Sequence, residues 1–299
     1  MPELPDIELY LAALRKRVTD RAFSEFKFYN PFALRTVAPK PADLLGKPIR
    51  DVFRLGKRIA FELEGGACIV VHLMIAGRFR WLAPTAKVQM KITHASWRLD
   101  DGILVLTEVS SKKRAGVWLF ASRSDAAGQD PGGLDPLSAS PEAFSEALLA
   151  ENRTIKRALT NPKRFSGIGN AYSDEILHAA RLSPLKLTKS LSADEVERLR
   201  LATRDTLNLW AAKLLDEFKG GDKFPGPGDV TAFRPDFAAH GKFGQPCPVC
   251  GRPIQRIRYA ENETNYCAEC QNEGRILADR ALSRLLKDDW PRSFSDEES

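Results

Sequence analysis

The stretch Arg58-Ile59-Ala60-Phe61-Glu62-Leu63 is one of several short apolar or alternating runs between about residues 22 and 120. Cys68–Leu73 and Ile103–Thr107 are two more, and Gly and Pro residues separate the runs. Alternation with a period of two is typical of strands with one buried face. A series of short strands bounded by turn residues predicts an antiparallel β domain, built as a sandwich or a barrel.

Residues 4–18, ahead of these runs, predict an amphipathic helix. Ile7, Leu11, Leu14 and Val18 recur at helical spacing and therefore share one stripe of that helix. A helix is thus expected to precede the strands.

The composition changes again after the last expected strand. Residues 122–140 are rich in Ser, Asp, Gly and Pro and predict an interdomain linker. Beyond them the apolar period becomes 3.6. Ser140 is expected to cap one helix, and Ser192 with Glu195 to form the capping box of another. A helical domain is therefore expected to follow the β domain.

The length and overall composition set outer limits on the class of protein. The chain has 299 residues, 43% of them hydrophobic and 28% charged, which suits a globular protein of two domains. No apolar run approaches the roughly 20 residues that cross a bilayer. The N-terminus carries no apolar stretch with a cleavage site. We therefore expect a cytoplasmic, nucleoid-associated protein without a membrane partner.

The charge distribution is compatible with a polyanionic partner. Lys and Arg number 45 against 39 Asp and Glu, a net charge of +6. Basic residues gather at 112–114, 156–157, 163–164 and 252–258. Such clusters suit phosphate contacts, and each one taken alone is equally a solvated loop.

Four of the five cysteines lie in one short segment. Cys247 and Cys250 form one C-x2-C pair, Cys267 and Cys270 form another, and sixteen residues separate the pairs. Two such pairs complete a tetrahedral four-thiolate shell, so we expect one structural Zn²⁺ with a β-hairpin at 254–266 between the pairs. Disulfides are the alternative, which a reducing compartment disfavours. The fifth cysteine lies in an apolar run and is expected to be an inert core residue.

Residues 152–181 predict two helices joined by a turn. Pro162 ends the first helix, while Gly167 and Gly169 allow the backbone to approach a ligand closely. The second helix is expected to begin near Asn170, and its free N–H groups suit a DNA phosphate, to which the Asn170 amide can also donate. An ordinary helical hairpin with glycines used for packing is the alternative.

Four features then occur in a fixed order. They are the start Met1-Pro2-Glu3-Leu4-Pro5-Asp6, the Gly56-Lys57 turn, Gly167-Ile168-Gly169-Asn170, and the paired cysteines. Together they resemble the formamidopyrimidine-DNA glycosylase/endonuclease VIII (Fpg/Nei) family, from residue 1 to about 272. The resemblance implies an α+β protein: an N-terminal antiparallel two-layer β-sandwich, then a helical domain with a helix–two-turn–helix motif and a C-terminal zinc-finger β-hairpin. DNA would lie in the cleft between the two domains.

With this resemblance the chain divides into five expected segments. They are a catalytic β-sandwich domain (1–121), an interdomain linker (122–140), a helical DNA-binding domain (141–240), a zinc finger (241–275) and a tail (276–299).

The N-terminal proline has a chemical rationale of its own. Pro2 is a small second residue, so Met1 is expected to be removed, which exposes a secondary amine. An α-amino group titrates near 7.7–8.0 and is partly unprotonated at neutral pH, as a nucleophile must be. Attack of this amine on C1′ of a nucleotide gives a cationic iminium, which expels the base and acidifies C2′ for strand cleavage.

Two neighbouring positions take their roles from the resemblance. Glu3 is implied to move protons to and from the deoxyribose, and Lys57 to contact the phosphate and the reacting nucleotide. Asp6 stands where many members have Glu, so contacts on the base side there are expected to differ.

The chain departs from the family pattern in the residues that hold and replace the flipped nucleotide. Asn262 stands five residues before Cys267, where the family has an arginine that clamps phosphates, and its loss is expected to weaken lesion binding by about 1.5–3 kcal/mol. The family's aromatic wedge falls on Ala115, so Lys113 and Arg114 are the remaining DNA contacts in that turn.

A second loop of the pattern survives in altered form. The intercalating methionine of the family falls on Ile75, with Met74 beside it, so an apolar side chain remains at this place. Flipping a base costs a few kcal/mol, and least for a damaged one. A weaker wedge is therefore expected to narrow activity toward lesions that are already poorly stacked.

These features favour a monomeric, bifunctional DNA glycosylase/AP lyase that removes oxidised bases of the formamidopyrimidine or 8-oxoguanine type from damaged double-stranded DNA. The alternative is a non-catalytic or lyase-impaired DNA-binding relative, which Asn262 and Ala115 motivate. A zinc-ribbon module without catalysis explains only the cysteines. The sequence leaves the choice between oxidised purines and pyrimidines open.

Overall fold

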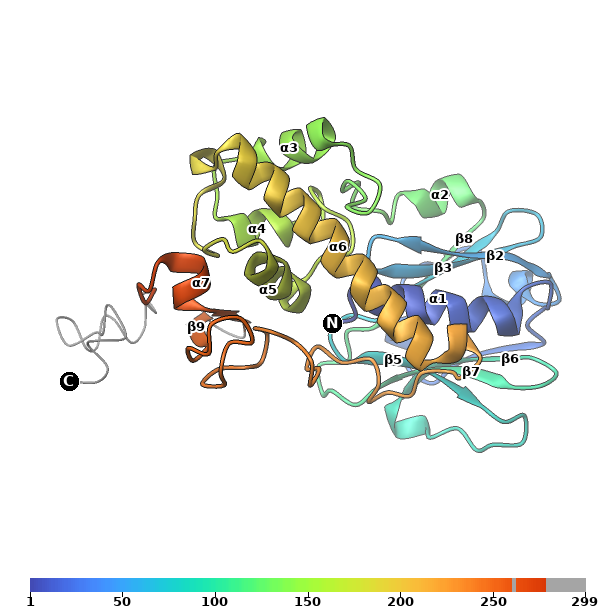
Figure 1. Cartoon of the computed structure of the whole chain (residues 1–299). Helices are drawn as coiled ribbons and strands as arrows, with labels where there is room; N and C mark the ends of the chain where they lie inside the picture. Colours follow the sequence, from blue (N-terminus) through green and yellow to red (C-terminus); the bar gives the residue numbers. More distant parts are fainter. Residues whose placement is uncertain (260–261, 278–299) are drawn as a thin grey trace. The chain divides into compact units, whose positions relative to one another are not determined.

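The computed structural model describes residues 1–259 and 262–277, and the chain divides into two compact units (Figure 1). The first unit comprises residues 1–132 together with 210–231. The second comprises residues 133–209 and the described residues from 232 onward. Most of the expected tail lies outside the described residues.

Two four-stranded antiparallel sheets make up most of the first unit, all of which is described (Figure 1). One sheet has the order β1-β6-β7-β5 and the other β2-β3-β4-β8. The strands are β1 (Glu25–Phe28), β2 (Ile49–Leu55), β3 (Arg58–Leu63), β4 (Cys68–His72), β5 (Gly77–Leu82), β6 (Thr93–Arg98), β7 (Ile103–Glu108) and β8 (Gly116–Phe120). The short 3-10 helices η1 (Pro31–Ala33), η2 (Pro41–Leu44) and η3 (Met90–Ile92) lie in the connections.

The two sheets share one hydrophobic core. Phe61 of β3 and Phe79 of β5 meet edge to face, with ring centroids 6.3 Å apart, and Trp97 of β6 packs on Phe79 at 6.3 Å. Side chains from both sheets and from the first helix belong to the same buried cluster. This arrangement is the two-layer sandwich that the alternating runs and the family resemblance predict, and it confirms that expectation.

Helix α1 (Leu4–Val18) covers this core over the residues expected from the sequence. Glu3 occupies the N-cap and Asp6 the third position of a capping box, with the Glu3 N–H donating to Asp6 Oδ2 at 3.0 Å. The predicted stripe of Ile7, Leu11, Leu14 and Val18 is buried. Because the helix begins two residues after Pro2, its first turn fixes the start of the chain.

The second unit is mainly helical. Its elements are α3 (Pro141–Leu149), α4 (Ile155–Leu159), α5 (Asn170–Ala179), η4 (Thr188–Ser190), the first part of α6 (Ala193–Glu217), the hairpin of β9 (Gln255–Tyr259) and β10 (Asn262–Tyr266), and α7 (Ala268–Asn272). The Ser140 hydroxyl accepts the Ala143 N–H at 3.2 Å, and the Glu195 carboxylate accepts the Ser192 N–H at 2.9 Å. Both predicted helix caps are therefore present.

The two units differ from the expected segments in two places. Residues 122–132 stay with the first unit and contain the short helix α2 (Arg123–Ala127). Residues 210–231, expected within the helical domain, also belong there and include η5 (Lys219–Gly221). Helical periodicity predicts α6 but cannot say which surface its end will cover.

The packing of residues 210–231 gives the physical reason. Leu214 and Phe218 bury their side chains with Leu9 of α1. The guanidinium of Arg17 donates to the carbonyl oxygen of Gly221 at 2.8 Å and to that of Asp222 at 2.5 Å.

Across the described residues, no helix combines the length and apolarity needed to span a membrane.

Candidate active site and nucleic-acid interface

The turn between β2 and β3 presents Lys57. Gly56 has φ +61°, a left-handed conformation that favours glycine, and a Cβ there would lie 3.0 Å from the ring of Pro131. The turn is therefore both tight and covered by a residue of the 122–132 segment. Burial lowers the pKa of the half-buried Lys57 ammonium, and the Glu3 carboxylate opposes this shift.

The start of the chain lies among charged groups. Burial is the main cause that lowers the pKa of the Met1 α-amino group. The carboxylates of Glu3 and Asp6 raise it, whereas Arg78 and Lys57 lower it. Pro2 and Glu3 are themselves buried, with Glu3 only 3% exposed. The fold thus brings Lys57, which lies more than fifty residues along the chain, into the same charged environment as the N-terminus and Glu3.

Arg78 is a member of this group that sequence analysis missed. It lies on β5, and its Nη1 donates to the carbonyl oxygens of Gly77 at 2.7 Å and Ile75 at 3.1 Å. Arg78 therefore connects the N-terminal group with the loop that carries Ile75. Strand alternation alone places an arginine on one face and does not reveal which loop it will hold.

The loop between β4 and β5 has a defined shape. Met74 has φ +53°, and its N–H donates to Nδ1 of the buried His72 at 3.1 Å. Ile75 at the tip is 57% exposed. A Cβ at Gly77 would lie 2.2 Å from the carbonyl oxygen of Leu73, so only glycine closes this turn. The loop therefore presents an apolar side chain to solvent, as expected.

The basic loop between β7 and β8 is anchored by a buried carboxylate. Glu108 Oε2 lies 2.9 Å from the Ala115 N–H and 2.9 Å from Nε2 of the buried His94. Ala115 is completely buried, so nothing at this position can act as a wedge. Lys113 Nζ donates to the carbonyl oxygen of Glu108 at 2.5 Å, which directs the ammonium back onto the loop. Arg114 is exposed.

In the second unit, Gly169 and Asn170 stand at a helix start as predicted. Gly169 is the N-cap of α5 and Asn170 its first residue. Lys156 of α4 donates its Nζ to the carbonyl oxygen of Asn170 at 3.1 Å, which ties the two helices together. A ten-residue helix begins here, and the partial positive charge of a helix N-terminus suits an anion.

Two acidic residues of α5 hold the segments that follow. The buried carboxylate of Asp174 accepts from His240 Nδ1 at 2.7 Å and from the Asn265 N–H at 3.1 Å, and it pairs with Lys156. Glu175 accepts the backbone N–H groups of residues 238, 239 and 240 at 2.7–2.9 Å. The hairpin β9–β10 is thereby fixed to α5 through buried charge-assisted hydrogen bonds.

The four predicted metal ligands converge. The Sγ atoms of Cys247, Cys250, Cys267 and Cys270 all lie within 4.8 Å of one another, and the Cys270 N–H donates to Cys267 Sγ at 3.4 Å. Four thiolates in this arrangement fit a tetrahedral structural zinc with no open position. His178 of α5, which sequence analysis missed, places Nε2 3.2 Å from Cys247 Sγ. The group is one structural zinc site.

The remaining predicted residue, Asn262, opens β10 opposite Tyr259, and its side chain lies outside what the structure describes. Nearby Arg256 stacks over the Phe243 ring at 4.2 Å and lies 3.7 Å from Glu263. The predicted residues therefore form two sets. Pro2, Glu3, Lys57 and the two loops belong to the first unit, and the helix start, Asn262 and the cysteines to the second.

Comparison with known protein families accounts for three separate stretches of the chain. Residues 1–114 match the formamidopyrimidine-DNA glycosylase N-terminal domain, and residues 133–213 match the formamidopyrimidine-DNA glycosylase H2TH domain. Residues 244–272 match the zinc finger found in FPG and IleRS.

Individual relatives agree with these matches. The chain is 34% identical to the formamidopyrimidine-DNA glycosylase of Thermus thermophilus, over 92% of this chain and 100% of the relative. It is 33% identical to that of Symbiobacterium thermophilum, over 94% and 93%. The structure is similar to that of Lactococcus lactis Fpg in complex with DNA containing an abasic site, with TM-score 0.79, 25% identity, and coverage of 90% and 99%. It is equally similar to the L. lactis Fpg complex with N7-benzyl-Fapy-dG DNA, again with TM-score 0.79.

Proposed function

The chain belongs to the formamidopyrimidine-DNA glycosylase family, and we propose that it is a bifunctional DNA glycosylase/AP lyase of base excision repair. Its substrates would be oxidised bases of the formamidopyrimidine or 8-oxoguanine type in double-stranded DNA. The observation that carries the proposal is the gathering of the N-terminal amine, Glu3 and Lys57 in one buried, charged environment.

The nucleophile in this proposal is the secondary amine of Pro2. While Met1 is present, the Pro2 nitrogen is part of an amide and cannot act as a nucleophile. Removal of Met1 is therefore the first requirement. Burial, Arg78 and Lys57 lower the pKa of the Met1 α-amino group, whereas Glu3 and Asp6 raise it, and we infer that the Pro2 amine would have the same charged neighbours. A lowered pKa raises the unprotonated fraction at neutral pH, which is the form that attacks C1′.

The chemical steps then follow from the charges. The amine nitrogen forms a bond to C1′ as the bond to the base breaks, and the proton that the nitrogen gives up passes to the leaving base. Opening of the sugar gives an iminium at C1′, with Glu3 placed to protonate the ring oxygen. The iminium acidifies C2′, whose proton passes to the Glu3 carboxylate left by the preceding proton transfer as the bond to the 3′ phosphate breaks. Hydrolysis of the final iminium returns the free amine.

The grip on DNA would come from both units. Lys57 and Arg114 supply cations in the first, and Gly169 and Asn170 supply the helix N-terminus in the second. Met74 and Ile75 would fill part of the space that the flipped base leaves. The zinc site would hold the β9–β10 hairpin, including Asn262, in the shape that meets DNA.

Borohydride trapping tests the proposal. Protein lacking Met1 should form a covalent adduct with duplexes that contain an abasic site or 8-oxoguanine. The matched control is the same chain with an N-terminal extension, which keeps every side chain but converts the Pro2 amine into an amide. An adduct of equal yield in that control would show that another amine reacts, and the Pro2 assignment would then be wrong.

A second candidate is a lesion-binding relative without lyase activity. The burial of Ala115 and the inward direction of Lys113 favour it, because both reduce the contacts available to a flipped nucleotide. Measurable lesion binding with no adduct on any duplex, from protein with a confirmed Pro2 N-terminus, would select this candidate.

A further inference from the structure

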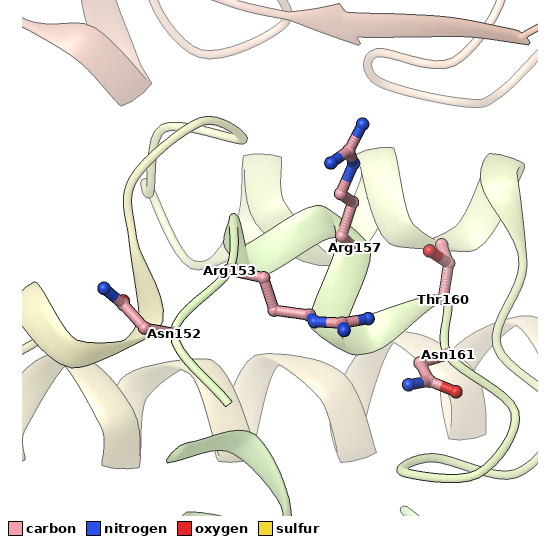
Figure 2. A pocket seen from close by; sticks show the side chains of 5 residues that line it. All are labelled: Asn152, Arg153, Arg157, Thr160 and Asn161. Carbon is pink, nitrogen blue, oxygen red and sulfur yellow. The ribbon is translucent and has the colours of Figure 1, made fainter. Parts of the chain in front are cut away.

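The beginning of the α4–α5 hairpin carries an open hollow of about 600 Å³ (Figure 2). Its lining residues are Asn152, Arg153, Arg157, Thr160 and Asn161. Figure 2 shows the Arg153 guanidinium directed along α4 toward Thr160 and Asn161, while Arg157 projects outward from the helix. The proposed glycosylase chemistry uses none of these residues.

The amide side chains of the hollow have their acceptors occupied from within the fold. Asn161 Oδ1 accepts the Lys163 N–H at 3.0 Å, and Asn152 Oδ1 accepts the Lys189 N–H at 3.4 Å. The side-chain NH2 group of each asparagine, which can only donate, therefore remains available to a ligand. The hollow thus offers amide donors from both of its ends.

The two arginines add positive charge to these donors. Arg153 pairs with Glu151, and the same carboxylate accepts from Arg164 at 2.9 Å, so one acid serves two arginines. Arg157 is exposed and has no ion-pair partner within residues 1–259 and 262–277. Arg153 and Arg157 of the lining, together with Arg164 beside it, are three guanidinium groups against the one Glu151 carboxylate, a net charge of +2. Donors and positive charge together select an anion with several acceptor oxygens.

We propose that this hollow binds a backbone phosphate of DNA, as a site separate from the N-terminus of α5. The proposal rests on the proposed DNA-repair function. The hollow is part of the same hairpin as Asn170, since Lys156, one residue before Arg157, bonds to the Asn170 carbonyl oxygen at 3.1 Å. The hollow is open and not enclosed, which suits one group of a continuous polymer better than a small molecule that must be surrounded.

A phosphate contact of this kind carries no information about the base. It should strengthen binding to damaged and undamaged duplexes by the same factor, and it should release counterions. Each phosphate neutralised contributes about 0.9 to the slope of log affinity against log salt. For a variant that has lost one such contact, the ratio of wild-type to variant DNA affinity should therefore fall about 3.5-fold when the salt concentration rises fourfold.

The test measures the affinity of full-length, zinc-loaded protein for two 30-base-pair duplexes, one with an abasic-site analogue and one undamaged, between 50 and 400 mM KCl. Arg157→Ala is expected to weaken both affinities equally and to lower the salt slope by about 0.9. Arg157→Lys should retain the slope, because the charge remains. Arg204→Ala is the matched control, an arginine of the second unit that pairs with Asp205 at 2.8 Å outside the hollow.

A second variant tests the amide donors. Asn161→Asp preserves the Oδ1 that accepts the Lys163 N–H and replaces the NH2 donor by a negative oxygen. It should weaken binding more than Asn208→Asp, which makes the same change of charge at an exposed position of α6. Equal effects of the two substitutions would show that only overall charge matters and would overturn the proposal.

Two further outcomes contradict the site as stated. An unchanged salt slope in Arg157→Ala means that no DNA phosphate occupies the hollow. If inorganic phosphate protects Arg157 from modification by phenylglyoxal while the slope is unchanged, the hollow binds free anions and the DNA assignment is wrong. Because the undamaged duplex reports the slope without any preference for lesions, this failure is distinct from failure of the glycosylase function.

Discussion

Acidification should destabilise the first unit through one histidine. Burial, followed by the positive charges of Arg58 and Lys57, lowers the pKa of His72 from 6.5 to about 4. The geometry agrees, because Nδ1 of His72 accepts the Met74 N–H at 3.1 Å and therefore carries no proton in the folded chain. Protonation at Nδ1 would break this bond and release the loop that carries Met74 and Ile75.

The direction and size of the effect follow from linkage. Below pH 6.5 the unfolded chain binds a proton at His72, whereas the folded chain does so only near pH 4. The unfolded state thus binds more protons in this window, and stability falls as the pH drops through it. The full difference is about 3 kcal/mol, and about 2.5 kcal/mol of it should be lost between pH 7.5 and 4.5.

The measurement is urea unfolding at a series of pH values, followed by tryptophan emission. Trp81, Trp97, Trp118 and Trp210 all belong to the first unit, so the emission reports mainly on that unit. His72→Asn retains an acceptor oxygen for the Met74 N–H but does not titrate. Between pH 7.5 and 4.5 the free energy of unfolding of this variant should therefore fall by about 2.5 kcal/mol less than that of the wild type. Parallel pH profiles of wild type and variant would refute the reasoning.

Three more results are expected. Asp174→Asn should destabilise the second unit by about 3–5 kcal/mol in chemical denaturation, because the side chain of Lys156 is left without its carboxylate; Asp194→Asn, on the exposed start of α6, should change little. His178→Phe should weaken zinc binding 10–100-fold in competition with a chelator, because it removes the Nε2–H that donates to the Cys247 thiolate. Burial lowers the pKa of His178, so the imidazole is neutral. Equal zinc affinities of variant and wild type would mean that this bond does not support the site. Asn262→Arg should tighten binding to an abasic-site duplex by up to about 1.5–3 kcal/mol; unchanged or weaker binding would mean that another residue has taken over this contact or that the DNA lies differently.

The donor-only character of the hollow on α4 depends on bonds that no motif encodes. Asn152 and Asn161 are nine residues apart, and their acceptors are occupied by Lys189 and Lys163 respectively. The corresponding sequence shows only polar residues beside two arginines, which is equally a solvated surface. Backbone placement decides that donors remain and acceptors do not.

The sequence by itself determined the elements whose cause is local. Alternating residues at 58–63 predict β3, the stripe from Ile7 to Val18 predicts α1, and Ser140 predicts the start of α3, because side-chain periodicity and caps act within a few residues. The two cysteine pairs likewise predict a metal site, since ligand spacing alone limits what they can do.

Only the tertiary structure decided the relations between distant residues. It added Arg78 to the N-terminal group, buried Ala115, turned Lys113 onto the carbonyl oxygen of Glu108, and placed His178 against a zinc ligand. It also assigned residues 210–231 to the first unit. Apart from the Lys113 bond, which spans five residues, these contacts join positions tens of residues apart. Their energies depend on burial and on dielectric surroundings that the fold creates, so no local pattern can predict them.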